Sequence, residues 1–402
     1  MSTSPQTDRP ATVPSAAADP AARPRTSRDP RLDNARLIAA VLIVIAHFGA
    51  MIYQHSGQMQ LLYFATWPMR VPLYALIAGY FSSAEPLGGR RAIALLRNVL
   101  LVYVAFDLIA SVQGWLLGGT LRIDLAAPAF ALWFLLSLFF WRLLLPLLSK
   151  IRFIIPISVL VALAAGFMPA VTPDLSASRT LCFLPIFLLG WKVKEVGLHH
   201  LLDRRSARIA AAAFLVVFWG VVVLLVQNYE MSRTWVNMRK GFPGDLDAQL
   251  DGMLIRVAVI AAGMIGALAM LALTPRGRVP FVSYLGTGSL YIYLLHPIVL
   301  KLVRSTGVAA HIDSRLEVAM LVAGATCLAL LLATPPVRRL TRWLIQPRYT
   351  WLFEPTGRDL RRVPEQAVVG GAAAIDLAKA PAPVVAVAAE TVAAPSGSAE
   401  PR

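Results

Sequence analysis

The sequence predicts an all-α, polytopic membrane protein with about ten transmembrane helices. Of its 402 residues, 57% are hydrophobic and only 15% are charged, whereas soluble domains carry about a quarter charged residues. The hydrophobic residues gather in blocks of about 17–25, the length that crosses a bilayer as a helix. The net charge of +16 does not indicate a nucleic-acid partner, because the basic residues occupy short loops between apolar blocks, as topology signals do.

The first five predicted spans are apolar runs bounded by charged or turn-forming residues. Residues 35–54 follow the charged turn RLDNAR. Residues 66–83 begin WPMRVP, whose prolines and arginine predict a broken or kinked entry. The basic stretch GGRR precedes 92–117, and AAPAF precedes 129–148. The stretch SKIR separates that span from 153–170.

The last five spans follow the same rule. Residues 179–194 end in the basic WKVKE, and 208–227 follow DRRSAR. The long charged and aromatic loop RTWVNMRKGFPGDLDAQLD precedes 253–273, and a loop of this kind is more often functional than idle. The turn TPRGRVP precedes 281–302, and HIDSR precedes 316–336. After the last span, VRRLTRWLIQ is amphipathic and is expected to lie along the interface.

The regions outside the spans predict two tails and no second domain. Residues 1–30 lack the apolar core of a signal peptide, and we expect them to be a disordered cytoplasmic tail. Residues 31–348 form the transmembrane domain. Residues 349–402, rich in Ala, Val and Pro, are expected to be a disordered tail. Lys and Arg are most frequent in the loops on the N-terminal side, which predicts a multi-pass protein of the plasma membrane with both termini in the cytoplasm.

The first span contains an arginine and a histidine on one face. Eleven residues separate Arg36 from His47, which is close to three full helical turns, or about 16 Å along the axis. Asp33 lies three residues before Arg36 and can pair with it. The spacing therefore predicts Arg36 at the cytoplasmic mouth and His47 near mid-membrane.

A buried imidazole near a guanidinium is expected to be neutral at pH 7 and can act as a general base. The geometry suits a long substrate with an anionic head at Arg36 and a reactive end at His47. An acyl-CoA fits, because its phosphates match arginine and its pantetheine arm spans the distance. This interpretation requires one groove that joins the two side chains. Alternatively, His47 only hydrogen-bonds a neighbouring helix.

Five stretches resemble the acyltransferase 3 family of integral-membrane O-acyltransferases. The spacing of Arg36 and His47 is similar to the family's Arg-X10-His signature, and VPLYALIAGYFSS, RRAIALLRNVLLVY, LWFLLSLFF and LGTGSLYIYLLHPIVL follow in the family's order. The LDN start and LPIFLLGW resemble the fucose 4-O-acetylase-like branch. Two places differ from the pattern: Ala78 stands where the family usually has serine, and Arg70-Val71 where the branch usually has His-Met.

The resemblance covers about 30–348 and implies about ten helices and an acyltransferase domain. It implies transfer of an acyl group, usually acetyl from acetyl-CoA, to a hydroxyl of a carbohydrate. The family's catalytic histidine and arginine map onto His47 and Arg36. Acetyl-CoA is then a co-substrate, with no bound cofactor expected, and the acceptor is a cell-surface, exopolysaccharide or lipid-linked glycan. Direct transfer and a transient acyl-histidine both remain open.

Three arginines are candidates for binding the donor. Arg90 and Arg91 precede the third predicted span, and Arg97 lies within it. Arginine forks match phosphate oxygens, so these residues could hold the phosphates of CoA. Arg90 and Arg91 could equally be topology signals.

Candidates for the acceptor side lie in the fourth and ninth spans. Tyr293 and His296 are three residues apart and share a face; they could orient the acceptor hydroxyl or complete a proton path, or they could anchor the helix end. Trp133 could stack on a sugar ring or simply pack. The remaining histidines lack ligand spacing, so no metal site is predicted.

A proton-coupled transporter or glycan exporter is the alternative function. In that case His47 and Arg36 would form a proton-coupling pair. The sequence lacks the internal repeats and paired broken helices that many transporters carry, which argues against this alternative.

Overall fold

The computed structural model describes residues 29–168, 174–239, 241–242, 244–347 and 352. Within these residues every regular element is a helix and no strand is formed, which confirms the all-α prediction. The predicted tails 1–30 and 349–402 lie outside the described residues, except at 29–30 and 352.

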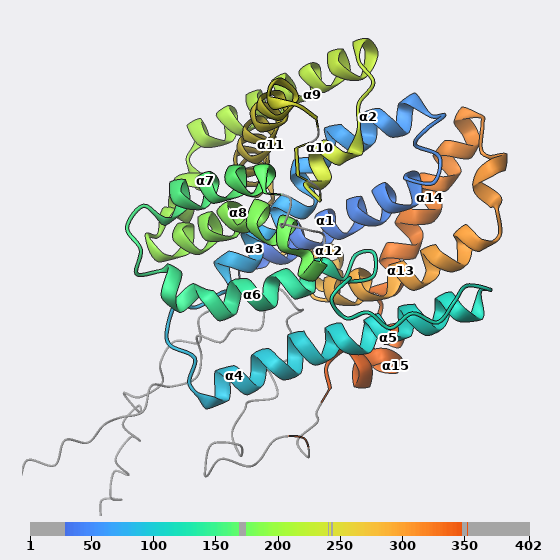
Figure 1. The fold of residues 1–402 in the computed structure, drawn as a ribbon, viewed down its shortest axis with the longest axis horizontal. Helices are drawn as coiled ribbons and strands as arrows, with labels where there is room; N and C mark the ends of the chain where they lie inside the picture. The colour runs from blue at the N-terminus through green and yellow to red at the C-terminus, as the bar shows by residue number, and fades with distance from the viewer. Residues whose placement is uncertain (1–28, 169–173, 240, 243, 348–351, 353–402) are drawn as a thin grey trace, which may run out of the picture.

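The helices are labelled in Figure 1 in chain order, with short 3₁₀- or π-helical segments written η. They are α1 Pro30–Gly49, α2 Gly57–Ala65, η1 Trp67–Met69, α3 Val71–Tyr80, α4 Gly89–Leu95, η2 Leu96–Leu100, α5 Leu101–Leu116, α6 Trp133–Leu148, α7 Ile154–Phe167, η3 Asp174–Ser176, α8 Ala177–Glu195, η4 Leu198–Asp203, α9 Arg205–Asn228, α10 Arg233–Asn237, α11 Leu246–Leu273, α12 Pro280–Gly286, α13 Ser289–Ser305, η5 Val308–His311, α14 Arg315–Leu332 and α15 Pro335–Ile345.

Each predicted span coincides with one or more helices, but the count of ten crossings is not confirmed. Among the described residues, five segments are long and apolar enough to cross a membrane: α1, the continuous α4–η2–α5 rod, α9, α11 and α14. The number rises to seven if each bent pair is one span, namely α2 with η1–α3, bent by 51°, and α12 with α13, bent by 67°. Helices α6 and α7 are apolar but shorter, and α8 carries charged residues at both ends.

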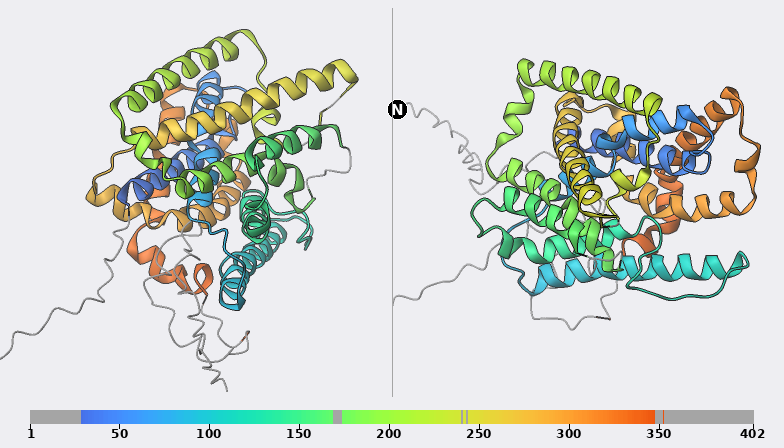
Figure 2. Two further views of the ribbon diagram at one scale, coloured as in Figure 1. Left: turned by 90° about the vertical axis from the view of Figure 1, so that its left-hand side faces the viewer. Right: turned by 45° about the horizontal axis from the view of Figure 1, so that its top comes forward.

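Helix α1 runs through the centre of the molecule (Figures 1 and 2), where it contacts α3, α12, α13 and α14. Helices α9 and α11 pack together on one side, and the α4–α5 rod lies with α15 on the opposite side. The outer face of α9 exposes Val216, Val217 and Leu224. The backbone groups of a helix are hydrogen-bonded within the helix, so an apolar outer face of this kind can contact lipid directly.

Two glycines bring α3 and α8 into backbone contact. A Cβ atom at Gly79 would lie 1.8 Å from the carbonyl oxygen of Phe187, and one at Gly190 would lie 1.9 Å from that of Leu76. Small residues allow such close approach between helices in a membrane. The contact fixes the position of α3, which carries Tyr74 of the site described below.

The first turn of α1 is anchored by polar contacts to distant loops. The side-chain amide of Asn34 donates to two carbonyls of the 275–277 turn, at 3.0 and 3.1 Å, and accepts from the hydroxyl of Ser283 at 2.6 Å. Arg31 forms an ion pair with Asp203. These partners allow a polar turn to be buried as part of the helix.

Helix α1 therefore begins at Pro30 rather than 35 and ends at Gly49 rather than 54. Asp29 accepts a hydrogen bond from the backbone N–H of Arg31 at 2.9 Å, and proline occupies the first helical position, both of which favour a helix start. His47 consequently lies in the last turn of α1.

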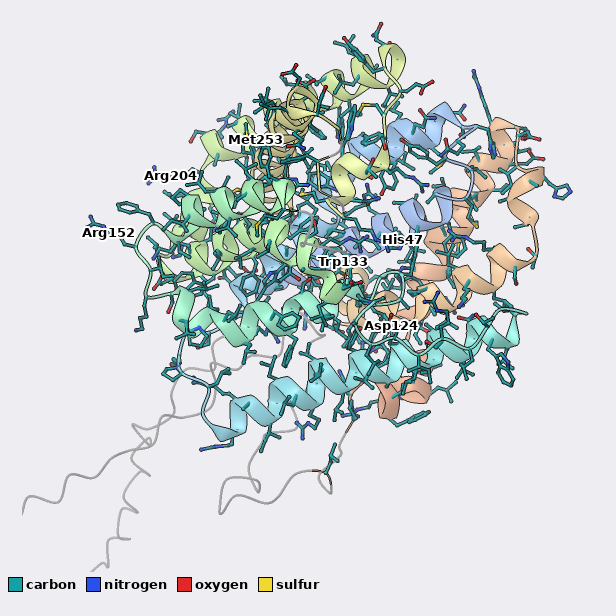
Figure 3. All side chains as sticks on the ribbon, in the orientation of Figure 1. His47, Asp124, Trp133, Arg152, Arg204 and Met253 are labelled. Carbon is teal, nitrogen blue, oxygen red and sulfur yellow. The ribbon has the colours of Figure 1, made fainter. Side chains whose placement is uncertain are left out.

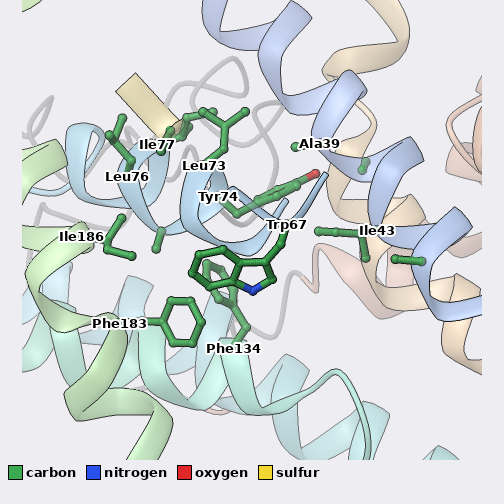
Figure 4. Packing of buried hydrophobic residues seen from close by; sticks show 14 of the residues in the cluster. Ala39, Ile43, Trp67, Leu73, Tyr74, Leu76, Ile77, Phe134, Phe183 and Ile186 are labelled. Atoms are coloured by element: carbon green, nitrogen blue, oxygen red, sulfur yellow. The ribbon is translucent and has the colours of Figure 1, made fainter. Parts of the chain in front are cut away.

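Aromatic residues from four elements, η1, α3, α6 and α8, pack beside α1 (Figure 4). The ring centroids of Trp67 and Phe183 lie 6.5 Å apart, and those of Tyr74 and Phe134 lie 6.3 Å apart. Ile43 of α1 faces this cluster. The cluster holds the wall of the site rigidly, because packed aromatic rings bury large areas.

Candidate active site

Two histidines from distant parts of the chain meet at the end of α1. His47 Nδ1 and His296 Nε2 lie 2.8 Å apart, and the two rings stack with centroids 5.1 Å apart. His296 Nδ1 lies 2.8 Å from the carbonyl oxygen of Ile292. His296 is fully buried, whereas His47 is half-buried. The structure thus places the predicted proton-path residue directly behind the predicted base.

These hydrogen bonds determine which ring nitrogens carry protons. A carbonyl oxygen can only accept, so His296 Nδ1 donates to Ile292. The Nε2 atom of a neutral His296 is then an acceptor, and His47 Nδ1 must donate to it. This arrangement leaves a lone pair on Nε2 of His47, as a general base requires.

His47 lines two cavities that meet at its ring. The larger, about 1520 Å³, lies at the end of the bundle where α1 ends, and the smaller, about 50 Å³, lies beside α3, α6 and α13. Ile43, Val71 and Trp133 also line both. Two reactants can therefore approach His47 from different spaces.

The smaller cavity is mostly apolar and extends toward the first half of α1. Tyr74 and Tyr293 line it. The hydroxyl of Tyr74 donates to the carbonyl oxygen of Arg36 at 3.1 Å, and that of Tyr293 donates to the carbonyl oxygen of Ala131 at 2.5 Å. Because an apolar cavity of about 150 Å³ holds benzene, this one admits a group of only a few heavy atoms.

The larger cavity is lined by Trp133, by residues of α1, α2, α8, α9, α10 and α13, and by loops between helices. The guanidinium carbon of Arg179 lies 4.7 Å from the centroid of the Trp133 ring. Residues 226–234 and 236–237, with Arg239, also line it, so most of the first part of the long loop that the sequence marked as functional faces this space. His47 and Trp133 are labelled in Figure 3 near the centre of the molecule.

Phe130 covers His47 from the loop 117–132. The two ring centroids lie 4.7 Å apart, with an interplanar angle of 60°. Phe130 has φ = 39°, a left-handed conformation that few residues with side chains adopt. The Asp107 carboxylate accepts a hydrogen bond from the backbone N–H of Ala129 at 2.8 Å. This bond holds the loop in place, and the sequence did not indicate Phe130 as a site residue.

Arg36 is buried in the opposite half of α1 and lines neither cavity. Its Nη1 atom donates to Asp33 Oδ1 at 3.0 Å, the pair that the spacing predicted, and its guanidinium carbon lies 4.4 Å from the centroid of the Phe81 ring. Neither of these two cavities joins the Arg36 guanidinium to the His47 ring. The link to the small cavity runs through the Arg36 carbonyl and Tyr74, because the guanidinium is packed against Asp33 and Phe81.

The three arginines predicted to bind CoA lie on the α4–η2 segment, and none lines either cavity. Arg91 forms an ion pair with Glu85. Arg97 Nε donates to Asn98 Oδ1 at 3.2 Å. The structure therefore does not bring Arg90, Arg91 or Arg97 to His47.

The sequence did not lead us to single out Arg142, a buried arginine of α6. Arg142 of α6 is 2% exposed, and its Nε atom donates to the hydroxyl of Ser82 at 3.3 Å. Ser82 follows Phe81, the residue under the Arg36 guanidinium. The signal was available, because an arginine inside an apolar span is rare unless it has a function or a buried partner.

No three His, Cys, Asp or Glu side chains within the described part of the chain are grouped so that they could hold a metal ion. A model of the family described as an acyltransferase domain matches residues 29–334. No curated protein and no solved structure matches the chain. The matched range contains both histidines and every residue that lines the two cavities.

Proposed function

This chain belongs to the acyltransferase family that its motifs resemble, and on that premise we propose that it transfers an acetyl group from acetyl-CoA to a hydroxyl of a carbohydrate. The family and the apolar helices make it a membrane acyltransferase. The observation that carries the proposal is that His47, with a lone pair on Nε2, lines both cavities.

In this reaction His47 acts as the general base. Its Nε2 atom takes the proton from the acceptor hydroxyl as the oxygen attacks the thioester carbonyl. The carbon–oxygen bond forms, the carbon–sulfur bond breaks, and the proton passes from His47 to the sulfur of the departing CoA. A placed base contributes about 10²–10⁴-fold, and holding the two reactants in contact supplies much of the remainder.

The small cavity is the site for the acyl group. Its volume of about 50 Å³ suits an acetyl group and excludes long acyl chains. The pantetheine arm enters from the end of the bundle at which α1 begins. The CoA phosphates bind at that end, where Arg36, Arg90, Arg91 and Arg97 are the candidates from the sequence and Arg142 is added by its burial beside Ser82.

The large cavity is the site for the carbohydrate, with Trp133 as a surface on which a sugar ring can stack. The N-terminal end of α1 lies among loops rich in Lys and Arg, which favours the cytoplasm for that end and for both termini. The large cavity then opens to the outside of the plasma membrane. Donor and acceptor approach His47 from opposite sides.

A transporter or exporter is not favoured. The family assignment is to an acyltransferase, and the paired histidines are explained by base catalysis. Transport would not require a thioester, so consumption of acetyl-CoA separates the two functions.

The test uses purified protein in lipid nanodiscs with labelled acetyl-CoA and a glycan acceptor. We expect CoA release and labelled glycan, and a loss of about 10²-fold or more in His47→Ala. His55→Ala is the matched control, because His55 is exposed and lines neither cavity. Equal turnover in His47→Ala at equal protein level would refute the proposal, as would glycan uptake without thioester consumption.

A further inference from the structure

The large cavity carries an excess of positive charge. Among the described residues that line it, five are arginines and two are carboxylates, Asp174 and Glu230. The arginines are Arg70, Arg179, Arg233, Arg239 and Arg304. Arginines at the end of the bundle away from the basic loops run against the usual bias in membrane topology, so they call for an explanation other than orientation.

Two of these arginines lie over aromatic rings of the same cavity. The Arg179 guanidinium lies over Trp133, as described above. The Arg233 guanidinium carbon lies 4.8 Å from the centroid of Tyr53, and its Nη1 atom donates to the carbonyl oxygen of Ala50 at 3.4 Å. A stacked guanidinium keeps its in-plane N–H groups directed sideways, where they can donate to an anion.

Arg70 is a further indication that the large cavity favours an anionic ligand. It is 4% exposed and lines the cavity, its guanidinium carbon lies 4.4 Å from the centroid of Tyr63, and it donates from Nη2 to the carbonyl oxygen of that residue. Its Nε atom has no hydrogen-bond partner among the residues that the structure describes. A buried guanidinium is costly, and a negative charge in the cavity would offset the charge of Arg70.

We propose that the acceptor is an anionic glycan, whose negative group binds these arginines and so places a neighbouring hydroxyl at His47. This inference rests on the proposed function and adds the chemical class of the acceptor. The group is a carboxylate on a sugar or a diphosphate on a lipid carrier. A carboxylate and a phosphate group each present two oxygen atoms that can accept hydrogen bonds from two N–H groups of one arginine.

Binding is measured on the purified full chain in nanodiscs with no donor present, so that it does not depend on acyl transfer. The probes are tetragalacturonate, maltotetraose and a polyprenyl diphosphoryl disaccharide. We expect at least one anionic probe to bind about tenfold or more tightly than neutral maltotetraose and to weaken as salt is raised. Tighter binding of tetragalacturonate assigns the charge to the sugar, and tighter binding of the diphosphate assigns it to the carrier.

The variants are Arg179→Gln and Arg233→Gln, which are half-buried, and Arg179→Lys, which retains the charge. Each glutamine variant is expected to weaken the anionic probe about tenfold and to leave maltotetraose unchanged, with partial recovery in Arg179→Lys. Arg122→Gln is the matched control, because Arg122 is an exposed arginine of the neighbouring loop that lines neither cavity. Size-exclusion profiles confirm that each variant is folded.

Equal affinity for neutral and anionic probes would overturn the inference. Displacement of tetragalacturonate by an equal concentration of CoA would also overturn it, because the cavity would then be a donor site. Acetyl transfer is assayed separately. Anion binding without any transfer would contradict the proposed function alone, and equally efficient transfer to maltotetraose and tetragalacturonate would contradict this inference alone.

Discussion

At the scale of single residues, His296 decides where the proton of His47 lies. Its Nδ1 atom is committed to the Ile292 carbonyl, so its Nε2 atom accepts from His47. A third group that orients a base is a common feature of catalytic sites. In the proposed mechanism, the uncharged imidazole of His296 takes that place, which avoids burying a carboxylate in a low-dielectric site.

His296→Ala is expected to lower kcat about 10- to 100-fold, the usual loss when the partner that orients a histidine is removed. His296→Gln should recover much of that loss, because its amide oxygen can accept the Nδ1 proton of His47. The measurement is kcat and KM for acetyl-CoA in nanodiscs. A purely structural role would predict similar losses in both variants, together with a lower thermal midpoint.

At the scale of elements, the close approach of α3 and α8 determines the shape of the site. Gly79 and Gly190 each lie where a Cβ atom would overlap a backbone oxygen of the other helix. Backbone atoms cannot rotate away as a side chain can, so the helices must separate if either glycine is replaced. Since α3 carries Val71 and Tyr74, such a movement reaches both cavities.

Gly79→Ala is expected to destabilise the protein by about 1–3 kcal/mol through overpacking, seen as a fall of about 1–4 °C in the apparent Tm. Gly220→Ala is the control, because Gly220 is a helical glycine of α9 with open space around its Cβ position. It should be neutral or slightly stabilising, since alanine favours helix. Scanning fluorimetry in detergent measures both, and equal Tm values would contradict the packing argument.

Much of the helical order could be predicted from the sequence, because long apolar runs leave few alternatives to a helix. The kinked entry at WPMRVP was also readable, and the structure has η1 and a bend there. The position at which α1 begins could not be predicted from the sequence. Whether the RLDNAR turn is helical depends on Asn34 and Arg31 finding partners near 275–277 and at Asp203, which are contacts that local sequence does not encode.

At the scale of the whole molecule, basic residues are concentrated at one end of the bundle. Arg152 and Arg204 are labelled at the left side of Figure 3, whereas His47 and Asp124 are labelled nearer its centre. The proposed orientation, with the basic end in the cytoplasm, rests on the positive-inside bias. In the proposed reaction, this orientation decides which cavity meets the acyl donor.

Single cysteines test this orientation in a background with Cys182→Ala and Cys327→Ala. Arg122→Cys, in the loop beside the large cavity, is expected to react with a membrane-impermeant maleimide in intact cells. Arg152→Cys should react only after the membrane is permeabilised. The reverse pattern would place the large cavity in the cytoplasm and exclude an external acceptor.

The site was only partly predictable at this scale. The periodicity of α1 indicated Arg36 and His47, and the pairing of Arg36 with Asp33 was confirmed. The contact between His47 and His296 joins residues 249 positions apart, and periodicity within one helix carries no information about such a pair. For the same reason, the sequence did not show that the Arg36 guanidinium lines neither cavity or that Arg179 lies over the Trp133 ring.

The thin boundary between the two cavities has a consequence for fidelity. Ile43, Val71 and Trp133 are the side chains, besides His47, that both cavities share. In the proposed reaction, these side chains help to keep solvent in the wide space from hydrolysing a thioester bound beside the same imidazole. Substitutions that reduce their apolar contact are then expected to raise hydrolysis of the donor relative to acyl transfer.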